Sequence, residues 1–303
     1  MNFNPKPGIA QELAPGIRRI LAPNPSAMTF KGTNTYLVGN RDIVVIDPGP
    51  PDEAHLSAIM SALKGHQRIS HIAVTHSHVD HSPLAMVLAQ FTGAKVYGFG
   101  SSTTGRASVM DNLTDLGGGE GVDETYLPDV KTPHLGEITG SDWLLRALHT
   151  PGHMGNHLCF ELDWTGQFSG HVFSGDLVMG WATSMVSPPD GHLTDFMASL
   201  ELLETRSDHM MYHPGHGAPV QDPQARVRAL WNHRKTRERQ ILEALQQSSG
   251  HAAALTALIY TDVDPRLLPA ATRNVLAHLI DLTARQIVAP KGTLREDVIF
   301  VLA

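Results

Sequence analysis

The sequence predicts an α+β fold of strands and helices, followed by a smaller helical domain. Short apolar runs separated by Gly/Pro turns and helical stretches fill residues 33–216, a pattern typical of sheets packed against helices. The charge balance changes near residue 221: residues 1–221 hold 12 Lys and Arg against 22 Asp and Glu, whereas residues 222–303 hold 11 against 8. We therefore expect one domain over residues 1–221 and a second over residues 222–303.

Composition excludes several classes of protein. At 303 residues and 42% hydrophobic content, the chain has enough apolar side chains for an ordinary globular core. No apolar stretch approaches the roughly 20 residues of a membrane span, and the N-terminus lacks the charged and then apolar build of a signal peptide. The single Cys159 has no partner for an intrachain disulfide. We expect a cytoplasmic protein that has no membrane partner.

Two apolar runs near the N-terminus predict a β-hairpin over residues 33–39 and 42–47, with Gly39-Asn40 as its turn. A buried strand is expected over residues 72–75. Ser82-Pro83 then predicts the N-cap and first position of a helix over residues 84–91 that ends near Gly93. Further short strands are expected at residues 144–149, 157–162, 170–174 and 209–212.

The C-terminal domain is predicted to begin with a long amphipathic helix over residues 223–247. Helices over residues 252–260 and 268–284 follow, and then strand-like runs over residues 286–288 and 297–302, which together outline a winged helix. Basic side chains are interleaved along the first helix: Arg226, Arg228, Arg234, Lys235, Arg237 and Arg239. A solvated helix face explains them better than a nucleic-acid contact, because the domain has only a small surplus of positive charge.

Residues 76–81 read His-Ser-His-Val-Asp-His and place four metal-ligand side chains directly after a predicted strand. Burying these groups without partners is costly, and a cation that they all ligate removes the cost. In extended backbone His76 and His78 point to the same side, whereas Asp80 and His81 lie in the turn before the next helix. This arrangement suits two neighbouring cations better than one, and a solvated histidine-rich loop is the weaker alternative.

Ligand-type residues also follow several other apolar runs. They lie in the tracts Asp47-Pro-Gly, Thr150-Pro-Gly-His153, Ser174-Gly-Asp176 and His213-Pro-Gly-His216. Other histidines near these tracts are each expected to be structural: His157, His171, His192 and His213.

Four motifs in this order resemble the metallo-β-lactamase-fold hydrolases over residues 16–220: H-x-H-x-D-H at 76–81, T-P-G-H at 150–153, S-G-D at 174–176 and P-G-H-G at 214–217. The resemblance implies a four-layer αββα sandwich. It also implies one metal held by His76, His78 and His153, and a second held by Asp80, His81 and His216. Asp176 would bridge the two metals, and Asp47 would orient a ligating imidazole without binding metal.

Two positions separate this chain from other branches of that family. Zinc β-lactamases carry Cys or Ser where this chain has Asp176, and the flavodiiron branch carries Glu where it has His78. The chain is also too short for the ribonucleases with a large inserted cap domain. It is therefore most similar to the glyoxalase-II and lactonase side of the family or to its smaller nucleases. With its C-terminal segment, it resembles the mitochondrial lactamase-beta-like endoribonuclease and its bacterial relatives.

The resemblance implies a dinuclear hydrolase in which a metal-bound hydroxide attacks an ester, thioester or lactone, and Asp80 orients the water or accepts its proton. An endoribonuclease or phosphodiesterase whose C-terminal domain contacts RNA is the alternative substrate class. A non-enzymatic, metal-stabilised binding protein is a third hypothesis. The expected cofactors are two divalent ions, zinc first, with iron or manganese also compatible with the ligands. Whether the chain forms a homodimer, and whether residues 117–121 form a lid, is left open.

Overall fold

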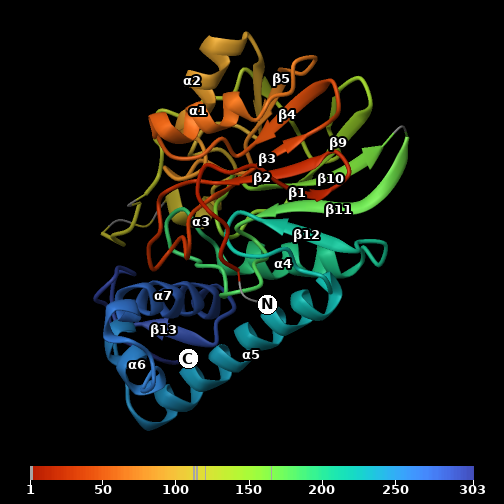
Figure 1. Cartoon of the computed structure of the whole chain (residues 1–303). Helices are drawn as coiled ribbons and strands as arrows, with labels where there is room; N and C mark the ends of the chain where they lie inside the picture. Colours follow the sequence, from red (N-terminus) through yellow and green to blue (C-terminus); the bar gives the residue numbers. More distant parts are fainter. Residues whose placement is uncertain (1–2, 112, 114, 120, 165) are drawn as a thin grey trace.

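Two facing β-sheets form the centre of the larger domain (Figure 1). The computed structural model describes residues 3–111, 113, 115–119, 121–164 and 166–303. In this part of the chain the first sheet has the order β1 (Gln11–Ala14), β2 (Ile17–Leu21), β3 (Asn34–Val38), β4 (Asp42–Ile46), β5 (Arg68–Ala73), β6 (Lys95–Gly98) and β7 (Val130–Lys131). The second has the order β12 (Met211–Pro214), β11 (Gln167–Gly175), β10 (Leu158–Trp164), β9 (Trp143–His149) and β8 (Glu137–Thr139).

Helices cover the outer faces of both sheets. Helices α1 (Glu53–Ser61) and α2 (Pro83–Thr92) lie on the first sheet, and α4 (Leu193–Glu204) lies on the second (Figure 1). A single short turn of helix, α3 (Ser108–Asp111), precedes residues 117–121, the glycine-rich loop. The order of layers is helix, sheet, sheet, helix, which confirms the predicted four-layer sandwich.

The alternation of side chains along the strands explains why both faces of each sheet are buried. In β4, Val44 and Ile46 pack in the core between the sheets, whereas Ile43 and Val45 pack against α1 and α2. In β10, Phe160 faces the same central core and Cys159 faces the α4 side. A continuous apolar run in the sequence therefore corresponds to a strand that is covered on both faces.

The predicted elements recur with small shifts. The hairpin over β3 and β4 is confirmed, but the strand predicted at 72–75 begins earlier, at Arg68, and ends at Ala73. Helix α2 ends with Gly93 at a φ of 72°, as its position predicted. Ser82 takes the predicted N-cap position and Pro83 the first helical position, but the Ser82 side chain does not cap the helix. Its hydroxyl donates to Asp123 Oδ2 at 2.7 Å and makes no cap hydrogen bond to the helix.

The C-terminal unit consists of α5 (Pro223–Gln247), α6 (Ala252–Ile259), a short 3-10 turn (Pro265–Leu267), α7 (Leu268–Ala284), β13 (Val288–Pro290) and β14 (Phe300–Leu302). Strands β13 and β14 pair antiparallel. β13 begins two residues later than the predicted run over residues 286–288, and β14 covers the last three residues of the run predicted over residues 297–302. The long helix α5 begins at Pro223, and the Asp222 side chain accepts from the backbone N–H of Ala225. The boundary between residues 221 and 222 stays a prediction, because α5 packs on both units.

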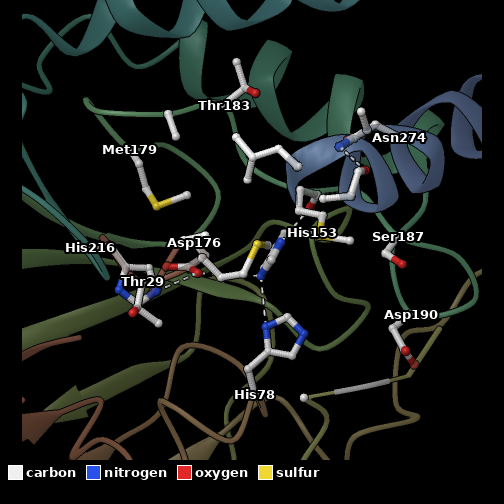
Figure 2. Close-up of a pocket in the computed structure, with 18 of the residues that line it drawn as sticks. Thr29, His78, His153, Asp176, Met179, Thr183, Ser187, Asp190, His216 and Asn274 are labelled. Carbon is white, nitrogen blue, oxygen red and sulfur yellow. Dashed lines mark hydrogen bonds and ion pairs between the residues drawn. The ribbon is translucent and has the colours of Figure 1, made fainter. Parts of the chain in front are cut away.

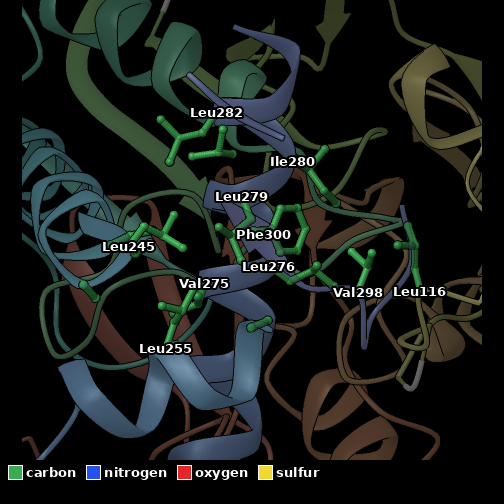
Figure 3. Packing of buried hydrophobic residues seen from close by; sticks show 14 of the residues in the cluster. Leu116, Leu245, Leu255, Val275, Leu276, Leu279, Ile280, Leu282, Val298 and Phe300 are labelled. Carbon is green, nitrogen blue, oxygen red and sulfur yellow. The ribbon is translucent and has the colours of Figure 1, made fainter. Parts of the chain in front are cut away.

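Helix α5 connects the two cores. Val227 and Leu230 in its first half belong to the core beneath the second sheet, whereas Ile241 and Leu245 belong to the C-terminal core. Figure 3 shows that C-terminal core, with Leu276 and Leu279 of α7 around Phe300 of β14. Within the described residues, no helix has the length and apolar character needed to cross a membrane.

The glycine-rich loop is attached to the C-terminal unit. Leu116 is buried in the C-terminal core beside Val298 (Figure 3). The Arg273 guanidinium on α7 donates to the carbonyl oxygens of Leu116, Gly117 and Pro188. The start of this loop is therefore held in place by α7. Within the loop, Glu120 lies outside the described residues.

Candidate metal centre

The predicted ligands lie where strands of both sheets end. His76 follows β5, Asp176 follows β11 and His216 follows β12, so their side chains meet at one edge of the sandwich. The structure brings together all seven predicted ligands in three overlapping groups of nitrogen and carboxylate oxygen atoms. The first group is His76, His78 and His153, and the second is Asp80, His81 and His216. A third group, His76, His81 and Asp176, connects these two.

The first group consists of three imidazoles that face one another. His78 Nδ1 lies 2.9 Å from His76 Nε2 and 3.1 Å from His153 Nε2. Figure 2 shows the rings of His78 and His153 approaching each other at the bottom of a pocket. Three ring nitrogens that converge in this way provide three ligands for one cation.

The second group combines two imidazoles with carboxylates. Asp80 Oδ2 lies 3.3 Å from His81 Nε2 and 3.2 Å from His216 Nε2. Asp176 lies between the two groups, because its Oδ2 atom is 3.2 Å from His216 Nε2 and 3.8 Å from His153 Nε2. Asp176 thus lies between the imidazoles of His216 and His153.

A set of hydrogen bonds holds the rings in one orientation. The Nδ1 atom of His81 lies 2.9 Å from Asp47 Oδ2, that of His153 lies 2.7 Å from the carbonyl oxygen of Met185, and that of His216 lies 3.2 Å from the carbonyl oxygen of Gly32. The acceptor beside each Nδ1 favours a proton on that atom and turns Nε2 toward the centre, where a neutral ring can ligate a cation.

Asp47 is itself fixed by Thr75, two residues beyond the end of β5. Its Oδ1 atom accepts the backbone N–H of Thr75 at 2.7 Å, and its Oδ2 atom accepts the Thr75 hydroxyl at 2.7 Å. The residue has a positive φ of 49°, which aspartate tolerates better than most side chains. Asp47 lies in none of the three groups of candidate ligands, and its contact with His81 is compatible with the orienting role that the resemblance implies.

Three residues that support the centre were missed or undervalued by sequence reasoning. The Thr33 hydroxyl donates to Asp80 Oδ2 at 3.0 Å, and the Asn34 amide donates to the carbonyl oxygens of Pro214 and Gly217 on either side of His216. His157 Nε2 accepts the backbone N–H of Asp176 at 3.2 Å, so it positions that carboxylate. For Asn34 the available signal was a polar residue in a fully buried strand, because such a residue needs partners. Thr33 and His157 directly precede β3 and β10.

The charges of the second group shift the pKa values of its members. Burial lowers the pKa of His216, but the carboxylates of Asp176 and Asp80 outweigh burial and raise it to about 9. Burial likewise opposes a high pKa for His81, and Asp80 and Asp176 raise it well above its usual value. Burial raises the pKa of both carboxyls, yet the two histidines hold them well below their usual range.

The first group has the opposite balance. Burial is the main cause that lowers the pKa of His76, His78 and His153, and it brings that of His78 to about 3. These imidazoles are therefore neutral at pH 7, the form that ligates a metal. In the second group a cation would replace two protons that balance the carboxylates, so binding there would release protons.

The residues fit a pair of divalent cations. His81 Nε2 and Asp176 Oδ1 are buried, lie 3.6 Å apart and, among the described residues, have no hydrogen-bond partner. Buried polar atoms without partners are costly, and a cation between them would satisfy both. The donors are imidazole nitrogens and carboxylate oxygens, which zinc, iron and manganese all accept.

The centre opens into a cavity of about 540 Å³ between the sandwich and the C-terminal unit. His78, Asp80, His153, Asp176 and His216 form its floor. Figure 2 shows Asn274, on α7, across the pocket from Thr29 and His216. The remaining lining is largely apolar and includes Met179, Trp181, Met185, Val263, Leu267, Ala270 and Ala271. A cavity of this size and character is typical of a small-molecule site.

Comparison with known proteins identifies the family. Residues 28–216, more than half of the chain, match the family model described as metallo-beta-lactamase superfamily. The chain belongs to the metallo-beta-lactamase superfamily. Residues 252–295 match the beta-lactamase associated winged helix domain, which confirms the winged helix predicted for this superfamily member.

Individual relatives agree with this assignment. The chain is 31% identical over 284 residues to the beta-lactamase-like protein 2 homolog of Drosophila melanogaster, covering 89% of this chain and 88% of that protein. It is 29% identical over 248 residues to an atrochrysone carboxyl ACP thioesterase of Cryptosporiopsis sp., covering 81% and 67% respectively. A crystal structure of a beta-lactamase domain protein from Burkholderia ambifaria shares the fold, with a TM-score of 0.81 at 21% identity over 100% of this chain and 96% of that one. Its superfamily and its thioesterase-named relatives make this chain a hydrolase.

Proposed function

We propose that the chain is a dinuclear metal-dependent hydrolase of a thioester, ester or lactone. The observation that carries the proposal is the position of the candidate metal centre at the floor of a largely apolar cavity. Such a cavity suits an acyl chain, whose apolar surface gains free energy by leaving water. The thioesterase names of several relatives support the same substrate class.

The centre supplies the reactivity that no side chain supplies alone. Divalent cations held by these ligands would supply a bound water whose pKa is lowered toward about 7 and would polarise a carbonyl oxygen. Cys159 is not suited to act as a nucleophile, since it is fully buried and burial raises the pKa of its thiol to about 12.

Asp80 has the geometry to handle the proton of the attacking water. Its Oδ2 atom is held by the Thr33 hydroxyl and by the rings of His81 and His216. Its Oδ1 atom has no hydrogen-bond or ion-pair partner among the described residues, and Asp80 lines the cavity. Oδ1 is therefore left to accept a hydrogen bond from the water and fix its orientation.

The use of the basic residues on α5 favours an acyl substrate over RNA. Arg226 donates to the carbonyl oxygens of Met179 and Ala182, and Arg234 donates to the carbonyl oxygen of Ser184. These side chains bind the C-terminal unit to the sandwich and do not form a basic face in solvent. RNA or another phosphodiester is the alternative substrate, and the experiment below distinguishes it from an acyl substrate.

The test is metal analysis of the purified protein combined with a panel of thioester, lactone, phosphodiester and RNA substrates. We expect turnover of a thioester or lactone that falls at least about a hundredfold in His153→Ala, since losing even an outer partner of a metal ligand often costs 10–100-fold. His66→Ala, a substitution of an exposed histidine, is the matched control and should behave as the unsubstituted protein.

Salt dependence separates the two substrate classes. Acyl turnover should change little as salt rises, whereas binding through several phosphates should weaken steeply. Cleavage of RNA alone, lost in His153→Ala, would replace the acyl proposal with the nuclease alternative. Activity that survives His153→Ala unchanged would arise from another site or a contaminant.

A further inference from the structure

The cavity has a second polar region, far from the strand ends in sequence and contributed by the C-terminal unit. His233, Arg234 and Arg237 of α5 line it together with Tyr260, which follows α6. Both arginines are positively charged, because guanidinium groups keep their protons at any pH that proteins survive. This wall therefore brings two positive charges into a cavity whose other walls are mostly apolar.

No carboxylate among the described residues neutralises these two charges. Arg234 is buried and bonded only to neutral acceptors, the side-chain oxygen of Asn274 and the carbonyl oxygen of Ser184. Arg237 donates from Nη1 to the neutral Gln240 side chain at 2.8 Å. Arg285, also in the C-terminal unit, differs from these two arginines because it pairs with the carboxylates of Glu238 and Asp281.

Arg237 also has a hydrogen-bond donor that no acceptor among the described residues uses. Its Nε atom is buried and, in the described part of the chain, has no hydrogen-bond partner. Its guanidinium carbon lies 4.1 Å from the centre of the Tyr260 ring, a cation–π contact that holds the group in one place. A fixed guanidinium with a free donor is prepared for a bidentate bond to a planar or tetrahedral anion.

The neighbouring histidines do not alter this charge balance. Burial lowers the pKa of His233 to about 4, and Arg234 and Arg237 contribute to that shift. Burial and then Arg234 also hold the pKa of His278, on α7, well below its usual value. Two neutral histidines beside two arginines leave the charge of the arginines uncompensated.

The carboxylates that line the cavity are all engaged elsewhere. Within the described residues they are Asp80 and Asp176, which belong to the metal centre, and Asp190, which pairs with Arg106. An anionic group in this wall would thus meet uncompensated positive charge and no competing carboxylate.

We infer that Arg237, with Tyr260 beside it, is the specificity-determining residue for a negatively charged group, a carboxylate or a phosphate, carried by the substrate at a distance from the bond that is cleaved. The inference rests on the proposed acyl hydrolysis and gives its substrate class: an apolar acyl compound with an anionic group. Either end of such a substrate could carry the charge. The anion is a carboxylate if it sits on the acyl tail, and a phosphate if it sits on the thiol arm.

Three thioesters of one acyl length distinguish these sources. Hexanoyl-N-acetylcysteamine is uncharged, adipoyl-N-acetylcysteamine carries a carboxylate on the acyl tail, and hexanoyl-phosphopantetheine carries a phosphate on the thiol arm. The wild-type protein should prefer one of the charged substrates by at least about tenfold in kcat/KM. Arg237→Gln should reduce that preference about 10- to 100-fold, mainly through KM, the range expected for a hydrogen bond to a charged group. Arg237→Lys should restore part of it.

Arg239→Gln is the matched control, because Arg239 is exposed on the same helix and, among the described residues, its ion pair is with Glu243. It should leave the preference unchanged. Equal preference for charged and uncharged substrates in the wild-type protein would overturn the inference. An Arg237→Gln variant that lowers kcat/KM for all three substrates alike would also overturn the inference. The proposed thioester hydrolysis would stand in that case.

A binding experiment separates this inference from the proposed function. If the wild-type protein hydrolyses none of the thioesters, the acyl proposal fails, and isothermal titration with free adipate and free phosphopantetheine then tests Arg237 alone. Binding of one of them that is at least about tenfold weaker in Arg237→Gln than in Arg239→Gln would support the anion site. Equal affinities in the two variants, or no binding to the wild-type protein, would overturn it.

Discussion

Replacing Asp47 with asparagine isolates the contact that orients His81. Asparagine has the same shape as aspartate and also tolerates a φ of 49°, so the backbone should not change. The side-chain oxygen of the introduced asparagine can still accept the backbone N–H of Thr75, but its amide –NH₂ then faces His81 Nδ1. Two donors cannot bond to each other, so the imidazole proton must move from Nδ1 to Nε2.

That change of tautomer removes a metal ligand. The Nε2 atom of His81 lies 3.3 Å from Asp80 and 3.6 Å from Asp176, within the candidate second site. Losing an outer partner of a ligating histidine typically costs about 10- to 100-fold in metal affinity, which is about 1.4–2.8 kcal/mol. We expect this loss in the second binding event, with the first event, at His76, His78 and His153, unchanged.

The assay is titration of metal-free protein with zinc in competition with a chelator of known affinity. Asp123→Asn is the matched control, since Asp123 accepts from Ser82 and Thr125 and contacts no candidate ligand ring. Two binding constants in Asp47→Asn that both lie within threefold of the wild-type values would refute the assigned role of Asp47.

Three further predictions concern stability. Gly118→Ala should lower the free energy of unfolding in urea by about 2 kcal/mol, because its Cβ would lie 2.4 Å from Nη2 of Arg273, whereas Gly166→Ala, at the same φ of 84° with no heavy atom within 4 Å, should cost about half as much. Phe300→Ala should cost about 3–5 kcal/mol, since Phe300 is fully buried in the C-terminal core, and a loss below about 1 kcal/mol would contradict that packing. Burial lowers the pKa of His55 to about 4, so its contribution to stability is present above about pH 6.5 and is lost as the pH falls toward 4. Between pH 7 and 4.5 the wild-type protein should therefore lose about 2–3 kcal/mol more stability than His55→Gln, and equal losses would contradict the shift.

Only part of the candidate metal centre could be predicted from the residues alone, because the signal at residues 76–81 is local. The assignment of His153, Asp176 and His216 rested on the resemblance to the metallo-β-lactamase-fold hydrolases. The alternation that directs His76 and His78 to one side needs only an extended backbone. Asp80 and His81 lie in the following turn, which the start of the next helix marks in the sequence. The bounds of the long helix α5 were also predictable, because Asp222-Pro223 marks its start and its apolar residues keep helical spacing. Patterns that depend on a few neighbouring residues survive into the structure.

Contacts between distant segments could not be predicted in the same way. Ser82 does not cap helix α2 with its side chain, because its hydroxyl donates to Asp123, which lies on another segment. The arginines of α5 have the spacing of a solvated face, yet Arg234 is buried, because Asn274 of α7 and the carbonyl oxygen of Ser184 accept its donors. The role of the C-terminal unit as a wall of the cavity follows only from how the two units pack.

The number of metal ions that the chain binds is the most direct test of the central claim, that the seven converging ligands form two adjoining sites. Native mass spectrometry of metal-free protein titrated with zinc measures it without reference to any substrate. Saturation at two ions per chain, falling to fewer in Asp176→Asn, is the predicted result. Saturation at one ion or none, with the protein folded, would contradict the account.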